Sequence, residues 1–143
     1  MITAVDTSVL LDVFGADTRF GERSRRALRR SLAEGRIIAC DVVWAELSGH
    51  FPSSSSFHDE AGRLGLEFSA LDERAAEVAG EEWKRYRSRG GRRERMVADF
   101  LIGSHARLHA ERLLTRDRGF YRTYFKNLRI FDPSMDPSRG EAA

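Results

Sequence analysis

Short apolar runs alternate with longer amphipathic segments along the chain. Five runs of three to five residues are rich in apolar and β-branched side chains, as buried strands are: residues 2–5, 36–40, 66–68, 112–115 and 128–131. Between these runs, apolar residues recur three or four positions apart, which is the spacing of a helix with one buried face. Strands that alternate with helices predict a three-layer α/β/α fold around a central, mostly parallel sheet of about five strands.

Capping residues and chain breakers mark where the predicted helices begin and end. The helical segments are expected near residues 8–14, 17–35, 42–47, 57–64, 72–86, 96–108 and 121–125. Thr7 or Ser8 is expected to cap the first helix. Asp41 and Asp72 are expected to cap the helices that follow the second and third strands. The proline and four serines of residues 52–56 interrupt the pattern and are expected to form a connection.

The composition is that of a soluble globular protein. The 143 residues are 41% apolar and 32% charged, which excludes a disordered chain and allows a sizeable core. One domain is expected over residues 1–133, followed by a polar tail over residues 134–143. No apolar stretch approaches the ~20 residues that span a bilayer, and the N-terminus lacks the pattern of a secretory signal. The single cysteine, Cys40, fits a reducing compartment, so a cytoplasmic protein without a membrane role is expected.

Charge is informative through its distribution and not through its sum. The net charge is only +2 although the isoelectric point is about 9.0. Residues 84–95 hold seven basic side chains against one acidic side chain. This segment is either a solvated helix end and loop or a surface for the phosphates of a nucleic acid, and its composition leaves both interpretations open.

Carboxylates stand where ligands bind in open α/β sheets. Asp6 and Asp117 each follow a short apolar strand and precede a helical segment. If their strands are neighbours at a switch in strand order, both carboxylates face one crevice. Glu46 and Asp99 are expected on helices that adjoin the same edge, and Asp99 interrupts an otherwise apolar run over residues 96–102.

Four carboxylates gathered in one place require a counter-ion. They repel one another, and their pKa values would rise unless a cation neutralised them. Ligand sets made only of oxygen select hard cations such as Mg²⁺ or Mn²⁺. Such ions activate water and stabilise the charge that develops on a phosphodiester during in-line displacement.

Four short motifs carry a resemblance to a known family. In chain order they are Asp6-Thr7-Ser8, Ala45-Glu46-Leu47, Ala98-Asp99-Phe100-Leu101-Ile102 and Thr115-Arg116-Asp117. They resemble the four acidic motifs of the PIN-domain family, in particular its VapC-type toxins, which are small ribonucleases of type II toxin–antitoxin pairs. The resemblance covers nearly the whole chain, and residues 85–95 are its least family-like part.

The resemblance implies a metal-dependent endoribonuclease that uses Mg²⁺ or Mn²⁺. Asp6, Asp99 and Asp117 would bind the metal directly or through water. Glu46 would be either a further ligand or the group that orients the attacking water, and all four acids would be catalytic. Ser8 or Thr115 would supply supporting hydroxyl groups. The resemblance also implies an RNA substrate, a cognate VapB-like antitoxin whose C-terminal segment occupies the groove, and a homodimer.

Arginine side chains are candidates for binding the RNA backbone. Arginine contacts to phosphate position a nucleic acid without reading its sequence. The candidates are Arg92, Arg93 and Arg95 in the basic segment, with Arg116 and Arg118 beside Asp117.

Other interpretations remain open or are disfavoured. A catalytically silent module that binds RNA or a protein, and an RNA-processing nuclease without an antitoxin, both remain open. A phosphatase is disfavoured because Ser8 stands where an Asp-x-Asp motif needs its second acid. A zinc site at His105 and His109 is disfavoured because the glutamate of His-Glu-x-x-His is missing. The remaining acids near strand and helix ends are expected at the surface or at caps: Asp12, Asp41, Asp72 and Asp132.

Overall fold

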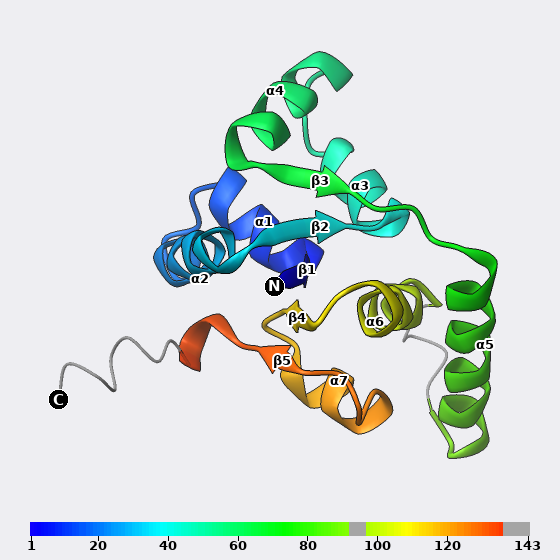
Figure 1. Cartoon of the computed structure of the whole chain (residues 1–143). Coiled ribbons are helices and arrows are strands. Elements are labelled where there is room, and N and C mark those ends of the chain that lie inside the picture. Colours follow the sequence, from blue (N-terminus) through cyan, green and yellow to red (C-terminus); the bar gives the residue numbers. More distant parts are fainter. Residues whose placement is uncertain (92–96, 136–143) are drawn as a thin grey trace, which may run out of the picture.

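Five parallel strands form one sheet at the centre of the protein (Figure 1). The computed structural model describes residues 1–91 and 97–135 of the chain. The strands are β1 Ile2–Val5, β2 Arg36–Ala39, β3 Leu66–Phe68, β4 Arg112–Leu114 and β5 Ile130–Phe131, in the order β3-β2-β1-β4-β5. Each neighbouring pair is parallel, so the predicted parallel α/β sheet is confirmed.

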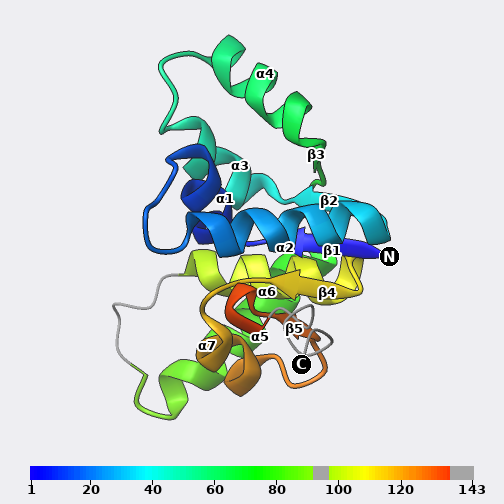
Figure 2. The same cartoon turned by 90° about the vertical axis from the view of Figure 1, so that its left-hand side faces the viewer.

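Helices cover both sides of this sheet. They are α1 Thr7–Phe14, α2 Gly21–Glu34, α3 Asp41–Ser48, α4 Ser54–Leu64, α5 Glu73–Ser88, α6 Val97–His109 and α7 Arg118–Tyr124. The two views show α2 on one side of the sheet and the packed pair α5 and α6 on the other (Figures 1 and 2). As predicted, two helices connect β1 to β2. In the described parts of the chain, no helix is both long enough and apolar enough to cross a membrane.

The strand order places a switch point at β1. The chain moves from β1 to β2 on one side and later returns to β4 on the other side of β1. In the register, Val5 pairs with Leu114, and the Asp6 N–H donates to the Leu114 carbonyl at 2.9 Å. The carboxyl ends of β1 and β4 therefore meet at the crevice where ligands bind in such sheets.

Aromatic side chains fill the core below this crevice. Phe100 on α6 is fully buried and meets the rings of Phe120 at 5.1 Å and Phe125 at 6.3 Å between centroids. Gly103, one turn further along α6, lies directly against the Phe125 ring, and a Cβ at this position would overlap that ring. The missing side chain at Gly103 thus lets Phe125, at the C-terminal end of α7, pack closely on α6.

Several predicted helix starts were displaced by one or a few residues. Asp6 caps α1, in place of Thr7 or Ser8, because its carboxylate accepts the Thr7 N–H. Asp41 is the first residue of α3 and not its cap, and its carboxylate instead accepts the Leu71 N–H at 2.5 Å. The predicted cap at Asp72 is confirmed, since its side chain accepts the Ala75 N–H.

Two other helix starts differ from the prediction because side-chain hydrogen bonds determine them. The spacing of apolar residues does not reveal such bonds. Ser53 and Ser56 form a capping box, so α4 begins at Ser54 within the serine run that was predicted to be a connection. The Asp17 carboxylate accepts two backbone N–H groups in a turn, which delays the start of α2 until Gly21. Helix α7 begins at Arg118, three residues before the predicted helical turn.

The end of the domain is a short 3₁₀ helix, η1, over Pro133–Met135. Asp132 begins it, because one carboxylate oxygen accepts both the Ser134 N–H and the Ser134 hydroxyl. The predicted tail thus begins inside this turn. Its remaining part, residues 136–143, lies outside the described residues.

Candidate active site

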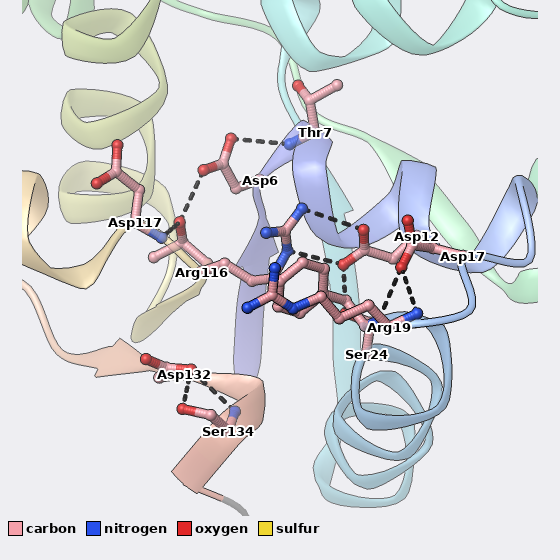
Figure 3. A network of polar contacts seen from close by, with 12 residues as sticks. Asp6, Thr7, Asp12, Asp17, Arg19, Ser24, Arg116, Asp117, Asp132 and Ser134 are labelled. Carbon is pink, nitrogen blue, oxygen red and sulfur yellow. Dashed lines mark hydrogen bonds and ion pairs between the residues drawn. The ribbon is translucent and has the colours of Figure 1, made fainter.

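Asp6 lies at the centre of the predicted site. It follows β1 directly, and only 8% of its surface is exposed. One carboxylate oxygen accepts the Thr7 N–H at 2.8 Å, and the other accepts the Thr115 hydroxyl at 2.7 Å. The cap of α1 and the end of β4 together hold this carboxylate in one orientation (Figure 3).

Thr115 joins Asp6 to Asp117. The Thr115 side chain is fully buried, and its hydroxyl oxygen accepts the Asp117 N–H at 3.0 Å while its hydrogen points to Asp6. One hydroxyl therefore fixes the first acid and the backbone of the last acid, although the two lie 111 positions apart in the chain. Figure 3 shows both carboxylates on the same side of this bridge.

Glu46 reaches the site from α3. The Thr7 hydroxyl donates to a Glu46 carboxylate oxygen at 3.1 Å, while the glutamate itself is exposed to solvent. The hydroxyl that holds Glu46 belongs to Thr7, whereas Ser8 and Thr115 were the predicted supporting residues. Thr7 is missed by motif reasoning because it also looks like an ordinary capping residue.

Asp99 completes the acidic cluster from the first turn of α6. It is half-buried. Burial raises the pKa of Asp6 to about 6; hydrogen bonds from Thr115 and Thr7 act against this rise, and the charges of Asp99 and Glu46 add to it. The structure therefore brings Asp6, Glu46 and Asp99 within electrostatic reach of one another.

The donor set fits a hard cation that keeps part of its water shell. The four side chains offer only carboxylate oxygens, and the charge of Asp6 is opposed by burial and by two neighbouring acids. Over residues 1–91 and 97–135, no three acidic, histidine or cysteine side chains are grouped closely enough to hold a metal ion in their present positions. Mg²⁺ typically takes one or two carboxylates and retains several waters, so an open set of this kind suits it.

Arg116 has a structural partner that was not predicted. Its guanidinium binds both oxygens of Asp12, with Nε at 2.8 Å and Nη2 at 3.1 Å, and it lies over the Phe20 ring at 4.1 Å (Figure 3). Asp12 is 4% exposed and also accepts the Ser24 hydroxyl at 2.8 Å. The prediction that Asp12 lies at the surface or caps a helix is therefore wrong.

This ion pair restrains the segment that carries the site. Arg116 stands between Thr115 and Asp117, so its bond to Asp12 ties the loop after β4 to α1. The sequence contains one indication that Asp12 is buried, because Asp12 lies three positions after buried Val9 on the apolar side of α1. Arg116 therefore has a structural role, and fewer of its N–H groups are available to bind a phosphate.

The other predicted arginines divide into two groups. Arg118 is exposed; its Nη1 donates to Met135 Sδ at 2.8 Å, and its Nε lies 3.7 Å from Asp132. Arg92, Arg93 and Arg95 lie outside the described residues.

His105 is a buried core residue. Its Nε2 lies 2.9 Å from the Ser69 hydroxyl, and burial lowers its pKa to about 4. A neutral imidazole with a hydroxyl partner accounts for its place in the apolar part of α6.

Comparison with protein families and with known proteins places this geometry in context. The family model of the PIN domain matches residues 3–126, a range that includes all four acids. Among curated proteins, no match to the chain was found.

Solved structures share the fold at low sequence identity. In the structure of VapBC2 from Rickettsia felis bound to a promoter DNA fragment, one chain matches with a TM-score of 0.70 at 21% identity, covering 92% of this chain and 98% of that one. For VapBC-1 from nontypeable Haemophilus influenzae the TM-score is 0.68 at 17% identity, with 94% and 99% covered. For VapC20 from Mycobacterium tuberculosis, named a sarcin-ricin loop cleaving toxin, it is 0.59 at 18% identity, with 89% and 98% covered. At these levels of sequence identity, the structural similarity establishes a shared fold alone.

Proposed function

The chain belongs to the PIN-domain family, as its four motifs predicted, and we propose that it is a metal-dependent endoribonuclease acting as the toxin of a type II toxin–antitoxin pair. The observation that carries the proposal is the gathering of the acids at the switch point of the sheet. Asp6 is buried beside the charges of Asp99 and Glu46, and Thr115 ties Asp117 to the same place. A cation would offset the repulsion that this arrangement creates.

Asp6, Asp99 and Asp117 would hold a Mg²⁺ or Mn²⁺ ion. When bound, such an ion supplies a Lewis acid for the phosphodiester and lowers the pKa of a coordinated water. The contribution of Thr115 is to fix the direction of the Asp6 carboxylate and the position of the Asp117 backbone before substrate arrives. Because these groups are already oriented, little reorganisation is needed at the moment of reaction.

Glu46 would orient the attacking water. One of its oxygens is held by the Thr7 hydroxyl, and the side chain is exposed toward solvent at the edge of the cluster. Its other oxygen can accept a hydrogen bond from the water and take up the proton as the new phosphorus–oxygen bond forms. The 3′- or 5′-oxygen of the ribose then leaves as the old bond breaks.

The partners are proposed from the same likeness. The matched structures from Rickettsia felis and Haemophilus influenzae are VapBC complexes, which supports a VapB-like antitoxin as the partner of this chain. The matched Mycobacterium tuberculosis protein is named for cleavage of the sarcin-ricin loop, which supports RNA as the substrate. A homodimer and a cytoplasmic location complete the proposal.

Cleavage of structured RNA should depend on a divalent ion and on Asp117. We expect the purified protein to cut a labelled RNA in Mn²⁺ and to be inactive in EDTA. Asp117→Asn should lower the rate at least about 100-fold, because it removes a charge from the metal site. The rate is measured by gel electrophoresis of the end-labelled fragments.

A matched control separates this effect from a general loss of negative charge. Asp59 is exposed on α4, and Asp59→Asn should cut RNA at the rate of the unaltered protein. Equal cleavage with and without EDTA, or equal rates for Asp117→Asn and Asp59→Asn, would show that the nuclease proposal is wrong.

A further inference from the structure

Two adjoining cavities lie along the side of the domain next to the acidic cluster. The smaller, of about 230 Å³, is lined by Arg23 and Arg116 together with the start of η1. The larger, of about 260 Å³, is lined by Arg30, Arg112, Arg122 and Arg129 and follows β5. Asp132 lines both cavities, so they form one path beside α2, β5 and η1.

The carboxylates along this path are already bonded within the protein. Asp132 accepts two bonds from Ser134 and faces Arg118. Glu34 binds Arg112 at 3.0 Å and Arg30 at 2.6 Å. These acids therefore compensate for only part of the positive charge that lines the path.

Arg112 forms a rigid base for the larger cavity. It is 7% exposed; its Nε donates to the Thr3 hydroxyl and one Nη to the Ser31 hydroxyl, and its guanidinium lies over the Phe131 ring at 4.6 Å. Burial lowers the pKa of Arg112, and the positive charges of Arg129 and Arg30 add to this effect.

Three arginines on the path have exposed side chains. They are Arg23 on α2, Arg122 on α7 and Arg129 just before β5. Within the described ranges, none of these three side chains makes a hydrogen bond or an ion pair, in contrast to the arginines paired with Glu22, Glu60 and Glu67 elsewhere on the surface. Unpaired guanidinium groups that line a cavity are suited to bind an anion.

The arginines are spread along a line and do not converge on a point. Arg112, which lines the larger cavity, begins β4, and Thr115 follows its end, so their backbones are about 10 Å apart at ~3.3 Å per strand residue. Arg116, next to Asp117, lines the intervening smaller cavity. A small anion would need only one converging group of donors, whereas a row of this length matches successive phosphates of a chain.

We propose that Arg23, Arg122 and Arg129 bind successive phosphates of single-stranded RNA that flanks the cut and leaves the acidic cluster along this path. The direction assigned to the RNA rests on the proposed nuclease function, because the path is followed outward from the place of cleavage. Contacts of this kind go to the backbone, so they position the RNA and contribute affinity for any sequence.

The test is the salt dependence of RNA binding by the triple variant Arg23→Gln/Arg122→Gln/Arg129→Gln. A fluorescent single-stranded RNA is titrated by anisotropy in EDTA, so that cleavage does not interfere, across a series of KCl concentrations. The triple variant should bind on the order of 10-fold or more weakly at low salt. Its slope of log affinity against log salt should fall by about 2, at ~0.7 for each lost phosphate contact on a single strand.

Controls make the result specific to the path. Arg63 on α4 is 77% exposed and paired with Glu60, and Arg63→Gln should leave affinity and slope unchanged. Thermal unfolding of the triple variant should match that of the unaltered protein, because the three replaced side chains are exposed and make no hydrogen bond or ion pair with the described residues. Single variants serve if the triple variant does not fold.

The outcomes separate this proposal from the nuclease proposal. If Mn²⁺ supports cleavage but the triple variant keeps its affinity and slope, the arginine path is wrong and the nuclease stands. If no metal-dependent cleavage occurs but the triple variant loses affinity for RNA, the three arginines bind RNA as proposed, whereas the nuclease proposal and the direction assigned to the RNA are wrong. A triple variant that keeps RNA affinity but no longer binds polyglutamate overturns the path in favour of an acidic polypeptide.

Discussion

Asp6→Asn is expected to remove RNA cleavage while making the metal-free protein more stable. A metal site supplies several kcal/mol of transition-state stabilisation, and ~4 kcal/mol corresponds to about a 10³-fold fall in rate. The same substitution removes a buried charge that lies beside two other acids. The amide oxygen of asparagine can still accept the Thr7 N–H that caps α1.

The gain in stability should depend on pH in a defined direction. Burial raises the pKa of Asp6 from 3.8 to about 6, so between these values the folded protein holds a proton that the unfolded chain has released. The contribution of Asp6 to stability is therefore greatest below pH 3.8, falls as the pH rises to about 6, and stays low above it. At neutral pH this loss is on the order of 2–3 kcal/mol.

Thermal unfolding in EDTA measures the effect. After the weaker contact with Thr115 is discounted, we expect Asp6→Asn to raise the Tm at pH 7.5 by about 3–6 °C, for a gain of ~1–2 kcal/mol. The gain should shrink as the pH falls toward 4, where the native carboxyl is protonated. Mn²⁺ should raise the Tm of the unaltered protein at pH 7.5 but not that of Asp6→Asn.

The opposite pattern would contradict this account of Asp6. A variant that is less stable at pH 7.5 in EDTA would mean that the carboxylate is stabilised by its hydrogen bonds alone and needs no cation. Asp59→Asn on α4 is the matched control, and it should change neither the Tm nor the response to Mn²⁺.

Asp12→Ala should cause the largest loss of stability among the polar substitutions considered. It leaves the Arg116 guanidinium and the buried Ser24 hydroxyl without their shared acceptor. Breaking a buried ion pair from one side costs about 3–5 kcal/mol. Because a third of the Arg116 side chain is exposed, we expect about 2–4 kcal/mol and a fall in Tm of about 5–15 °C.

A surface pair provides the comparison for Asp12. Glu60 and Arg63 pair on α4 with both side chains largely exposed, so Glu60→Ala should cost less than about 1 kcal/mol. The double variant Asp12→Ala/Arg116→Ala should lose less than the sum of the two single variants. Equal losses for Asp12→Ala and Glu60→Ala, or strict additivity, would show that this ion pair does not hold the loop after β4.

The fold and the acids could be predicted because their signals are local. Asp6 and Asp117 each follow an apolar strand, and the polar residue Asp99 stands out in an apolar helix. The parallel sheet then brings strand ends together without further information. Family membership added the pairing of Glu46 with these three.

The pair of Asp12 and Arg116 could not be predicted in the same way. The two residues are 104 positions apart, and neither lies in a recognised motif with the other. Their contact depends on how α1 packs against the loop after β4. The row formed by Arg23, Arg122 and Arg129 has the same origin, since three separate segments place one arginine each along one path.

The helix starts that were predicted at the wrong residues depend on a few side-chain hydrogen bonds. A run of serines has a low helix propensity and reads as a connection, yet the capping box of Ser53 and Ser56 begins α4 within it. At Asp6 the choice between capping α1 and belonging to the site was not exclusive, because each carboxylate oxygen serves a different purpose.

Crystals grown in Mn²⁺ show whether Asp6, Asp99 and Asp117 hold a divalent cation. Anomalous diffraction locates Mn²⁺ without reference to a chosen mechanism. We expect a peak at the carboxyl ends of β1 and β4, about 2.0–2.3 Å from oxygens of Asp6 and of Asp99 or Asp117, with waters completing the shell. No peak between these carboxylates at saturating Mn²⁺, in crystals of a protein that cleaves RNA, would contradict it.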